Sequence, residues 1–385
     1  MFYTFAMLDY PLMTHDYNTY KEIFQQPKVW LKTLNYIRAN KNEIQAFTDK
    51  YLQEGYEIVL TGAGTSAYIG DALEPALYTT GFKGAKAIAT TDIITNPEMY
   101  FDSSSKVLLV SFARSGNSPE SVGAIKTVEK TAGKVAHIFI TCNKDGHLAR
   151  TQGDNILCLL LPPETNDLSL AMTSSYSTML LCCSMVANIS RIDEDAPLIE
   201  EVATCVEKAM AKYETALQDF ASRDFNRAIF LGSGPLKGVA EECRLKLQEL
   251  TDGAVMCAYD SFLGFRHGPK AVVKNDSLLV YLVSPNPTVR RYELDLIRQV
   301  NANNHVKGVL VACFQKPELE EGDFDLCIET GISPSMPACY GCVSFAFVGQ
   351  MLGLFKSIDK GLSPDSPSVS GNISRVVEGV TLYMD

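Results

Sequence analysis

The chain has little positive charge for its size. Its 385 residues include 34 Lys and Arg against 45 Asp and Glu, which leaves a formal net charge of −11 at pH 7. Nucleic acid and anionic membrane surfaces bind basic faces, so this balance argues against either as the main partner. The sequence also predicts no membrane span, on the expectation that no uncharged run is long enough to cross a bilayer. An acidic chain can still hold one basic pocket for a small anion.

Disulfide and metal-binding patterns are also missing. The eleven cysteines are scattered and lie mostly inside apolar runs, as at Cys158, Cys182 and Cys313. This placement is typical of reduced thiols in the core of a cytoplasmic protein rather than of a disulfide framework. The single C-x-x-C, Cys339 to Cys342, has neither a second pair nor a nearby His, so we interpret it as packing. We expect no metal site, no cofactor and a cytoplasmic location.

Two nucleotide-binding signatures are absent as well. The stretch TGAGTSAYIG, residues 61–70, has Ala67 where the dinucleotide fingerprint needs its third Gly. No Gly-Lys-Ser/Thr follows it, so it is not a P-loop either. The glycines therefore predict only a tight turn from a strand into a helix.

After residue 55 the chain alternates short β-rich runs with segments of helical periodicity. The expected strands of the first half are 58–61, 86–90, 107–112, 135–141 and 156–161. The expected helices are 66–80, 118–131 and 173–190. This alternation predicts an α/β fold, with a parallel sheet and crossover helices on both of its faces. A helical pattern over residues 17–55 precedes the alternation.

The alternation then repeats with a constant offset. LTGAG at residue 60 matches FLGSG at residue 230, and LLVSFARSGNS at 108 matches LLVYLVSPNPT at 278, so both pairs are 170 residues apart. Equal spacing at two landmarks predicts duplicated α/β domains. We place an N-terminal helical extension at 1–44, the first domain at 45–205, the second at 206–365 and a tail at 366–385.

Two polar turns follow predicted strands of the first domain. Their candidate ligand-binding residues are Gly64, Thr65, Ser66, Arg114, Ser115 and Ser118. Backbone N–H groups and the helix dipole favour an anion at such helix starts. The carboxyl ends of neighbouring parallel strands meet at one edge of a sheet, so the two turns predict a single phosphate site. The alternative is two ordinary capped helices.

The copy of the second turn in the second half has fewer donors. Ser284, Pro285 and Pro287 stand there, and Pro supplies no N–H. The phosphate is therefore expected in the first domain.

Taken together, these motifs resemble a known family. GAGTS followed by SFARSGNSPES resembles the sugar isomerase (SIS) domain, whose Ser/Thr-rich turns hold the phosphate of a phosphosugar. The duplication is similar to the isomerase half of glucosamine-6-phosphate synthase. IFQQPKVW, ETNDLSLAMTSSYSTM, YDSFLGFRHGPK and SGNISRVVEGV, spread over residues 23–380, resemble AgaS-type tagatose-6-phosphate ketose/aldose isomerases and galactosamine-6-phosphate deaminases. The resemblance implies two tandem SIS domains, a sugar-phosphate substrate and a homodimer with shared active sites.

The resemblance also implies which residues move protons. Glu242, Lys246 and Glu249 lie at i, i+4 and i+7 of an expected helix and so share one face. Their spacing alone favours a solvated ion-pair stripe. The matching helix of the synthase carries the enolisation base, which implies Glu249 as base and Lys246 as the residue that steadies it. The HGP of FRHGPK matches the synthase's ring-opening histidine, which implies that His267 acts across a subunit interface.

Further positions are expected at the sugar. Thr173, Ser174 and Ser175 open the helix after the fifth strand, where a cap needs only one of the three hydroxyls, so we expect one or two of them to face the substrate. Arg375 stands where the synthase tail carries a lysine. Because an arginine cannot form a Schiff base, we expect it to contact substrate oxygens. Ala113 stands where many phosphate turns of this domain have Ser, and Arg114 is expected to compensate with its charge.

The resemblance leaves several reactions open. No glutaminase domain is expected before residue 55, so the chain is not expected to make ammonia from glutamine. Opening and isomerising a 2-amino-2-deoxyhexose 6-phosphate gives a ketimine, which water hydrolyses to a ketose phosphate and ammonia. We therefore expect deamination of galactosamine 6-phosphate to tagatose 6-phosphate. Deamination of glucosamine 6-phosphate, plain aldose/ketose isomerisation and a non-enzymatic role as a sugar-phosphate sensor are the alternatives.

Overall fold

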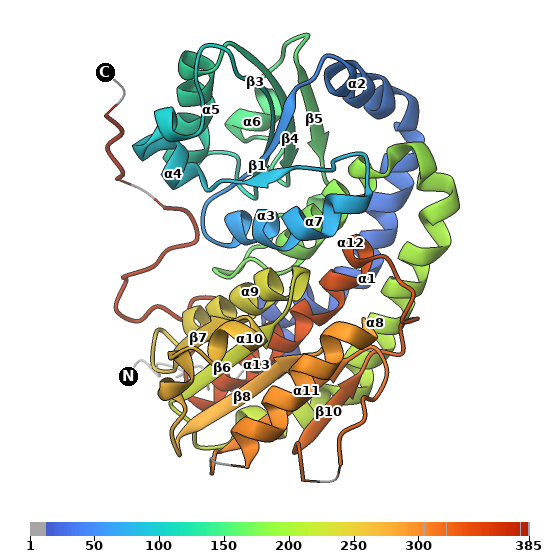
Figure 1. Cartoon of the computed structure of the whole chain (residues 1–385). Coiled ribbons are helices and arrows are strands. Elements are labelled where there is room, and N and C mark those ends of the chain that lie inside the picture. Colours follow the sequence, from blue (N-terminus) through green and yellow to red (C-terminus); the bar gives the residue numbers. More distant parts are fainter. Residues whose placement is uncertain (1–12, 303–304, 321, 378, 384–385) are drawn as a thin grey trace, which may run out of the picture.

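Two α/β lobes make up the described part of the chain (Figure 1). The computed structural model describes residues 13–302, 305–320, 322–377 and 379–383. Residues 1–12 of the predicted N-terminal extension and residues 378, 384 and 385 of the predicted tail lie outside this part. Long helices run along one side of both lobes, and the tail passes from the lower lobe to the upper one on the opposite side (Figure 1).

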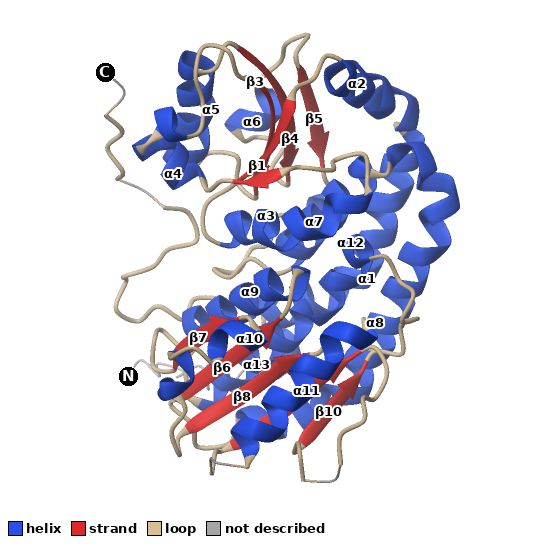
Figure 2. Ribbon diagram, viewed as in Figure 1, coloured by secondary structure: helices blue, strands red, loops and turns tan. Residues whose placement is uncertain are grey.

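The first lobe is built on a parallel sheet with the order β2-β1-β3-β4-β5. Its strands are β1 (Glu57–Thr61), β2 (Lys86–Ala87), β3 (Lys106–Ala113), β4 (Lys134–Thr141) and β5 (Ile156–Leu160). Its helices are α3 (Thr65–Ala76), α4 (Thr90–Thr95), α5 (Pro119–Thr131), α6 (His147–Arg150) and α7 (Ser174–Ala187). Helices cover both faces of the sheet, which is why the central strands β3 and β4 have nearly continuous apolar sequences (Figure 2).

The second lobe repeats this arrangement. Its strands are β6 (Arg227–Gly232), β7 (Met256–Asp260), β8 (Ser277–Leu282), β9 (Gly308–Cys313) and β10 (Leu326–Glu329). Its helices are α9 (Pro235–Leu250), α10 (Phe262–Phe265), α11 (Pro287–Asn301), α12 (Ala338–Gly341) and α13 (Ala346–Asp359). The strands are parallel in the order β10-β9-β8-β6-β7. Read in reverse, the order is β7-β6-β8-β9-β10, which corresponds strand by strand to β2-β1-β3-β4-β5 of the first sheet. The predicted α/β class with two parallel sheets is therefore confirmed.

Three further helices pack along the two lobes. They are α1 (Asn18–Ala39), α2 (Lys41–Gln53) and the 30-residue α8 (Ile192–Ala221). Helix α1 packs against α7 of the first lobe and α13 of the second, as well as against α8. The predicted domain boundary at 205/206 falls inside α8, which continues unbroken across it. Short 3₁₀ helices lie at Thr14–Asp16, Leu77–Thr79, Pro97–Met99, Pro163–Thr165, Ile189–Arg191, Pro269–Val272 and Cys342–Phe345.

One buried segment corrects a prediction from the sequence. Residues Ala338–Asp359, which include α12 and α13, are long and apolar enough to cross a membrane, with a mean hydropathy of 1.6. The expectation that no run is long enough was therefore wrong. However, 94% of the apolar window is buried inside the protein, where α13 packs against α8 and α9. The apolar character of the segment thus reflects its place in the core.

Candidate active site

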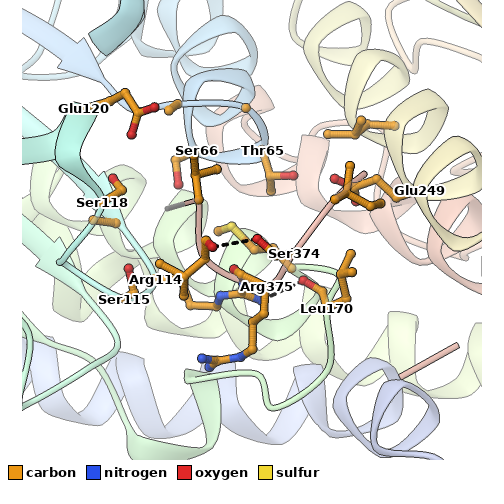
Figure 3. Close-up of a pocket in the computed structure, with 18 of the residues that line it drawn as sticks. Thr65, Ser66, Arg114, Ser115, Ser118, Glu120, Leu170, Glu249, Ser374 and Arg375 are labelled. Carbon is orange, nitrogen blue, oxygen red and sulfur yellow. Dashed lines mark hydrogen bonds between the residues drawn. The ribbon is translucent and has the colours of Figure 1, made fainter. Parts of the chain in front are cut away.

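A cavity of about 530 Å³ lies where the two lobes meet. It is at the carboxyl ends of β1 and β3, and the last turns of α9 and the tail close it (Figure 3). The first lobe contributes Ala63, Gly64, Thr65, Ser66, Ala113, Arg114, Ser115, Ser118, Glu120, Ser121, Leu170 and Met172. The second lobe and the tail contribute Leu245, Lys246, Glu249 and the segment 371–377.

The turn after β1 brings Thr65 and Ser66 to the cavity. Gly64 has a φ of +54°, a conformation that side chains disfavour, and it lets α3 start directly after the strand. The hydroxyl of Thr65 accepts a hydrogen bond from Lys246 Nζ at 3.0 Å. Thr65 therefore links the first lobe to the helix that carries Lys246, whereas Ser66 faces the cavity (Figure 3).

The turn after β3 supplies serine hydroxyls. Ser118 caps α5: its Oγ accepts the N–H of Ser121 at 3.3 Å and lies 2.7 Å from the Ser121 hydroxyl. Ser115 lines the cavity beside them (Figure 3). Glu120 and Ser121 also line it, and of these two Glu120 was not predicted from the sequence. The available signal was its position in the first turn of α5, since side chains there surround the positive end of the helix dipole.

Arg114 is bound mainly to the protein itself. The residue is 6% exposed, and its guanidinium donates to the carbonyl oxygens of Ser169 at 3.3 Å, Leu170 at 3.1 Å and Arg375. These bonds hold the segment after β5 and the tail against the turn after β3. Three of the five N–H donors of its guanidinium bind backbone, so at most two remain for phosphate, and the contact of Arg114 with phosphate stays a prediction. Its charge still lies at the cavity wall.

Lys246 connects two carboxylates on α9. Its Nζ lies 2.7 Å from Glu249 Oε2 and 3.4 Å from Glu242 Oε1. Lys246 and Glu242 are buried, whereas the Glu249 side chain is 22% exposed and faces the cavity. The helical face predicted from the i, i+4 and i+7 spacing is therefore a buried charge cluster and not a solvated stripe.

Burial and charge act in opposite directions on this cluster. Burial raises the pKa of Glu242 to about 8, against the lowering effect of Lys246. Burial by itself lowers the pKa of Lys246, but the two carboxylates outweigh it, so this pKa is raised overall. Lys246 therefore stays charged beside Glu249 at neutral pH.

The tail closes the cavity and brings Arg375 to its wall, where other parts of the chain bind much of the Arg375 head group. The guanidinium of Arg375 donates to Asn166 Oδ1 at 3.0 Å and to the carbonyl oxygen of Asp167 at 2.9 Å. These acceptors bind Nε and one Nη of its head group, and Arg375 also lines the cavity, so its contact with substrate oxygens stays a prediction. The other residues of the segment 371–377 line the cavity too and were not predicted, since the segment forms neither helix nor strand and so has no periodic sequence signal.

Thr173 and Ser174 do not reach the cavity. Both are fully buried and, with Ser175, surround the carboxylate of Asp167. Asp167 accepts the Thr173 N–H at 2.8 Å, the Ser175 hydroxyl at 2.6 Å and the hydroxyls of Thr173 and Ser174. The prediction that one or two of these hydroxyls face the sugar is wrong, because a buried acceptor binds all three.

His267 is exposed and lies outside the cavity of its own chain. It follows α10, in the turn before the 3₁₀ helix Pro269–Val272. A single chain therefore brings together Lys246 and Glu249 but not His267.

Comparison with known proteins places this geometry in a family. Residues 50–189 match the SIS-domain family model. D-galactosamine-6-phosphate deaminase AgaS of Escherichia coli O157:H7 is 36% identical over 376 residues, which are 95% of this chain and 95% of that protein. The chain belongs to the AgaS family of SIS-domain proteins.

Other AgaS-type proteins agree with this assignment. D-galactosamine-6-phosphate deaminase AgaS of Shewanella sp. (strain ANA-3) is 37% identical over 373 residues, 95% of this chain and 91% of the relative. The crystal structure of tagatose-6-phosphate ketose/aldose isomerase from Escherichia coli superposes with a TM-score of 0.87 at 34% identity, covering 97% of this chain and 98% of that one. The AgaS family predicted from the sequence motifs is therefore confirmed.

Proposed function

We propose that this AgaS-family protein deaminates galactosamine 6-phosphate to tagatose 6-phosphate and ammonia. The names of its relatives support this class of reaction. The observation that carries the proposal is that Glu249, backed by the buried Lys246, faces the same cavity as the serine-rich turns of the first lobe. A base and a phosphate-binding surface in one cavity are the elements that enolisation of a sugar phosphate requires.

The proposed phosphate position lies between the starts of α3 and α5. Ser66, Ser115, Ser118 and Ser121 line the cavity there, and the positive ends of both helix dipoles favour an anion. Glu249 lies on the opposite wall, on α9 (Figure 3). The open sugar chain then extends from the turns toward Glu249, with its carbonyl end at the carboxylate.

The proposed chemistry starts from the open-chain amino aldose. Glu249 removes the proton from C2, the C–H electrons form a C1=C2 double bond, and the carbonyl oxygen on C1 gains a proton. Return of a proton from Glu249 to C1 gives a ketimine at C2. Water adds to the C=N bond and ammonia leaves, so the last step is a hydrolysis. Lys246 steadies Glu249 through a hydrogen bond of 2.7 Å.

We also propose that the protein works as a cytoplasmic homodimer with shared active sites. His267 is exposed and does not line the cavity of its own chain, so it is available to the cavity of a partner, where an imidazole can open the hexose ring. All eleven cysteines are free, which fits a reducing compartment.

Ammonia release tests the proposed reaction. The protein is incubated in parallel with galactosamine 6-phosphate and glucosamine 6-phosphate, and ammonia and ketose phosphate are both measured. We expect equimolar ammonia and tagatose 6-phosphate from the galacto substrate.

Glu249→Gln should lower kcat by roughly 10²–10⁴-fold while sugar phosphate still binds. Glu200→Gln, an exposed change on α8, is the control and should leave kcat unchanged. Absence of ammonia from both amino sugars would contradict deamination.

The relative of known structure, a tagatose-6-phosphate ketose/aldose isomerase, favours a second candidate, which is aldose/ketose isomerisation of tagatose 6-phosphate without loss of nitrogen. The same carboxylate can move a proton between C1 and C2 of a neutral sugar phosphate. Incubation with tagatose 6-phosphate alone separates the two candidates. Rapid formation of the aldose without any activity on amino sugars would replace the first proposal with this one, and binding without turnover would indicate a sensor.

A further inference from the structure

The second lobe contains a cavity of about 630 Å³ at the carboxyl ends of its own strands. Its wall includes the starts of α9 and α11 and the segment that precedes α12. This cavity is separate from the candidate active site, since the two share no lining residue. Nothing in the proposed reaction uses it, and the inference drawn from it does not depend on that reaction.

This cavity is the second lobe's copy of the proposed phosphate site. Gly234 has φ +56° and ψ −127°, and Gly64 at the matching turn of the first lobe has φ +54° and ψ −128°. The two glycines are 170 residues apart and follow equivalent strands, β6 and β1. Equal backbone conformation and equal topology indicate a duplicated ligand-binding turn rather than an accidental hollow between helices.

The copy has lost the groups that bind an anion. Pro235 and Pro285 stand at the positions of Thr65 and Ser115, and neither offers an N–H or a hydroxyl. Asn286 Oδ1 accepts the first free N–H groups of α11, those of Thr288 at 2.9 Å and Val289 at 3.3 Å. These helix-start donors are therefore occupied within the protein.

A buried carboxyl group makes an anion still less favourable. The N–H of Ser284 donates to Glu293 Oε2 at 2.8 Å and is therefore not free to bind an anion. Among the described residues, none of those that line the cavity is charged. An ion placed there would lose its hydration without gaining a counter-charge, so the uncharged lining favours a neutral ligand.

The remaining wall is apolar and suited to an aromatic ring. Phe314 and Met336 line the cavity and are 4% and 5% exposed, and prolines with Leu236 and Val289 complete the surface. Aromatic and thioether side chains pack favourably on ring faces and edges. The volume is within the roughly 300–1,000 Å³ range of small-molecule sites.

We propose that this cavity is a second ligand site, which binds a neutral aromatic small molecule and excludes sugar phosphates. Its occupant would contact Pro235 and Leu236 in the first turn of α9. The same helix carries Lys246 and Glu249 near its other end, in the candidate active site. The two sites therefore lie at opposite ends of one rigid element.

Binding of N-phenyl-1-naphthylamine, a neutral aromatic fluorophore, tests the proposal. We expect saturable, one-to-one fluorescence enhancement with the wild-type protein. Val289→Glu should weaken binding at least tenfold, because it places a charge in the cavity, and an acidic residue at the start of α11 favours the helix. Tyr292→Glu is the matched control: it lies on the same helix, is 54% exposed and does not line the cavity, so probe affinity should stay unchanged.

Three outcomes would overturn the proposal. The first is a wild-type protein that binds no probe, and the second is a Val289→Glu variant that binds the probe as tightly as Tyr292→Glu. The third is displacement of the probe by galactosamine 6-phosphate, which would place the probe in the first cavity. If Val289→Glu fails to fold by circular dichroism, Ser335→Trp replaces it, because this change fills the cavity from an exposed position and should also abolish binding.

Discussion

At the level of single residues, the candidate site depends on which groups the Lys246 ammonium contacts. Its Nζ donates to Thr65 and Glu249 and lies 3.4 Å from Glu242. Glu242 is fully buried, and this burial raises its pKa to about 8. Near neutral pH Glu242 therefore holds a proton, and the positively charged Lys246 forms its ion pair with the carboxylate of Glu249.

The stability of the protein should report this buried proton. Between the ordinary pKa of a glutamate, 4.5, and a folded-state pKa of about 8, the folded chain keeps a proton that the unfolded chain releases. The contribution of Glu242 to the free energy of unfolding is thus fully present below about pH 4.5 and falls as pH rises toward 8. Glu242→Gln should remove this fall, so that its stability relative to wild type rises by roughly 2–5 kcal/mol between pH 5 and pH 8.

Urea unfolding at the two pH values measures this difference. Glu200→Gln, exposed on α8, serves as the control and should follow the wild-type protein at both pH values. A pH dependence of Glu242→Gln identical to that of wild type would show that Glu242 is ionised in the folded state at neutral pH.

At the level of elements, the crossing of α3 and α9 holds the two halves of the site together. These helices come from equivalent places in the two lobes and pack against each other. At Gly238 the backbones are so close that an added Cβ would lie 2.4 Å from the backbone nitrogen of Ala72. The glycine therefore sets the distance between the turn that carries Thr65 and the helix that carries Lys246.

Gly238→Ala should separate the two helices. Alanine is better than glycine in a helix by about 1 kcal/mol, but forcing a methyl group against backbone typically costs about 1–3 kcal/mol. We expect a net loss of stability and a lower kcat/KM, because the Thr65–Lys246 contact crosses the same interface. Lys237→Ala, at the adjacent exposed position of α9, should change neither the thermal midpoint nor kcat/KM. A Gly238→Ala protein as stable and active as wild type would refute this role of the crossing.

At the level of the whole molecule, the candidate site is assembled from distant parts of the chain. The first lobe supplies serine hydroxyls, α9 supplies Lys246 and Glu249, and residues 371–377 of the tail close the cavity. His267 is missing from this set within one chain. In the proposed homodimer, the partner chain supplies the histidine that completes this set.

Mixing two inactive variants tests this assembly. Glu249→Gln and His267→Ala are each expected to have little activity alone. After the two are unfolded together and refolded, random pairing should restore about a quarter of wild-type turnover, since half of the dimers are mixed and each has one intact site. Sedimentation velocity checks that dimers form. No recovery in verified mixed dimers would contradict a site that takes His267 from the partner.

Much of the fold and part of the site could be predicted from the sequence. Buried parallel strands require apolar runs, and glycine-rich turns are needed where a strand passes directly into a helix. The strands β1, β3, β6 and β8 could therefore be predicted from the amino-acid sequence. The spacing of Lys246 and Glu249 placed them on one face, and the position of Ser66, Ser115 and Ser118 after strands placed them at one sheet edge. These are local properties, which depend on backbone geometry alone.

Only the tertiary structure decided which partner each polar group meets. Thr173 and Ser174 start a helix as predicted, but the carboxylate of Asp167 lies against them and takes their hydroxyls. Arg114 and Arg375 lie at the cavity as expected, yet backbone carbonyls from other segments bind their guanidinium groups. Sequence spacing determines the direction of a side chain from its own helix or strand. The groups opposite it come from residues far away in the chain, and their identity follows only from how the two lobes and the tail pack together.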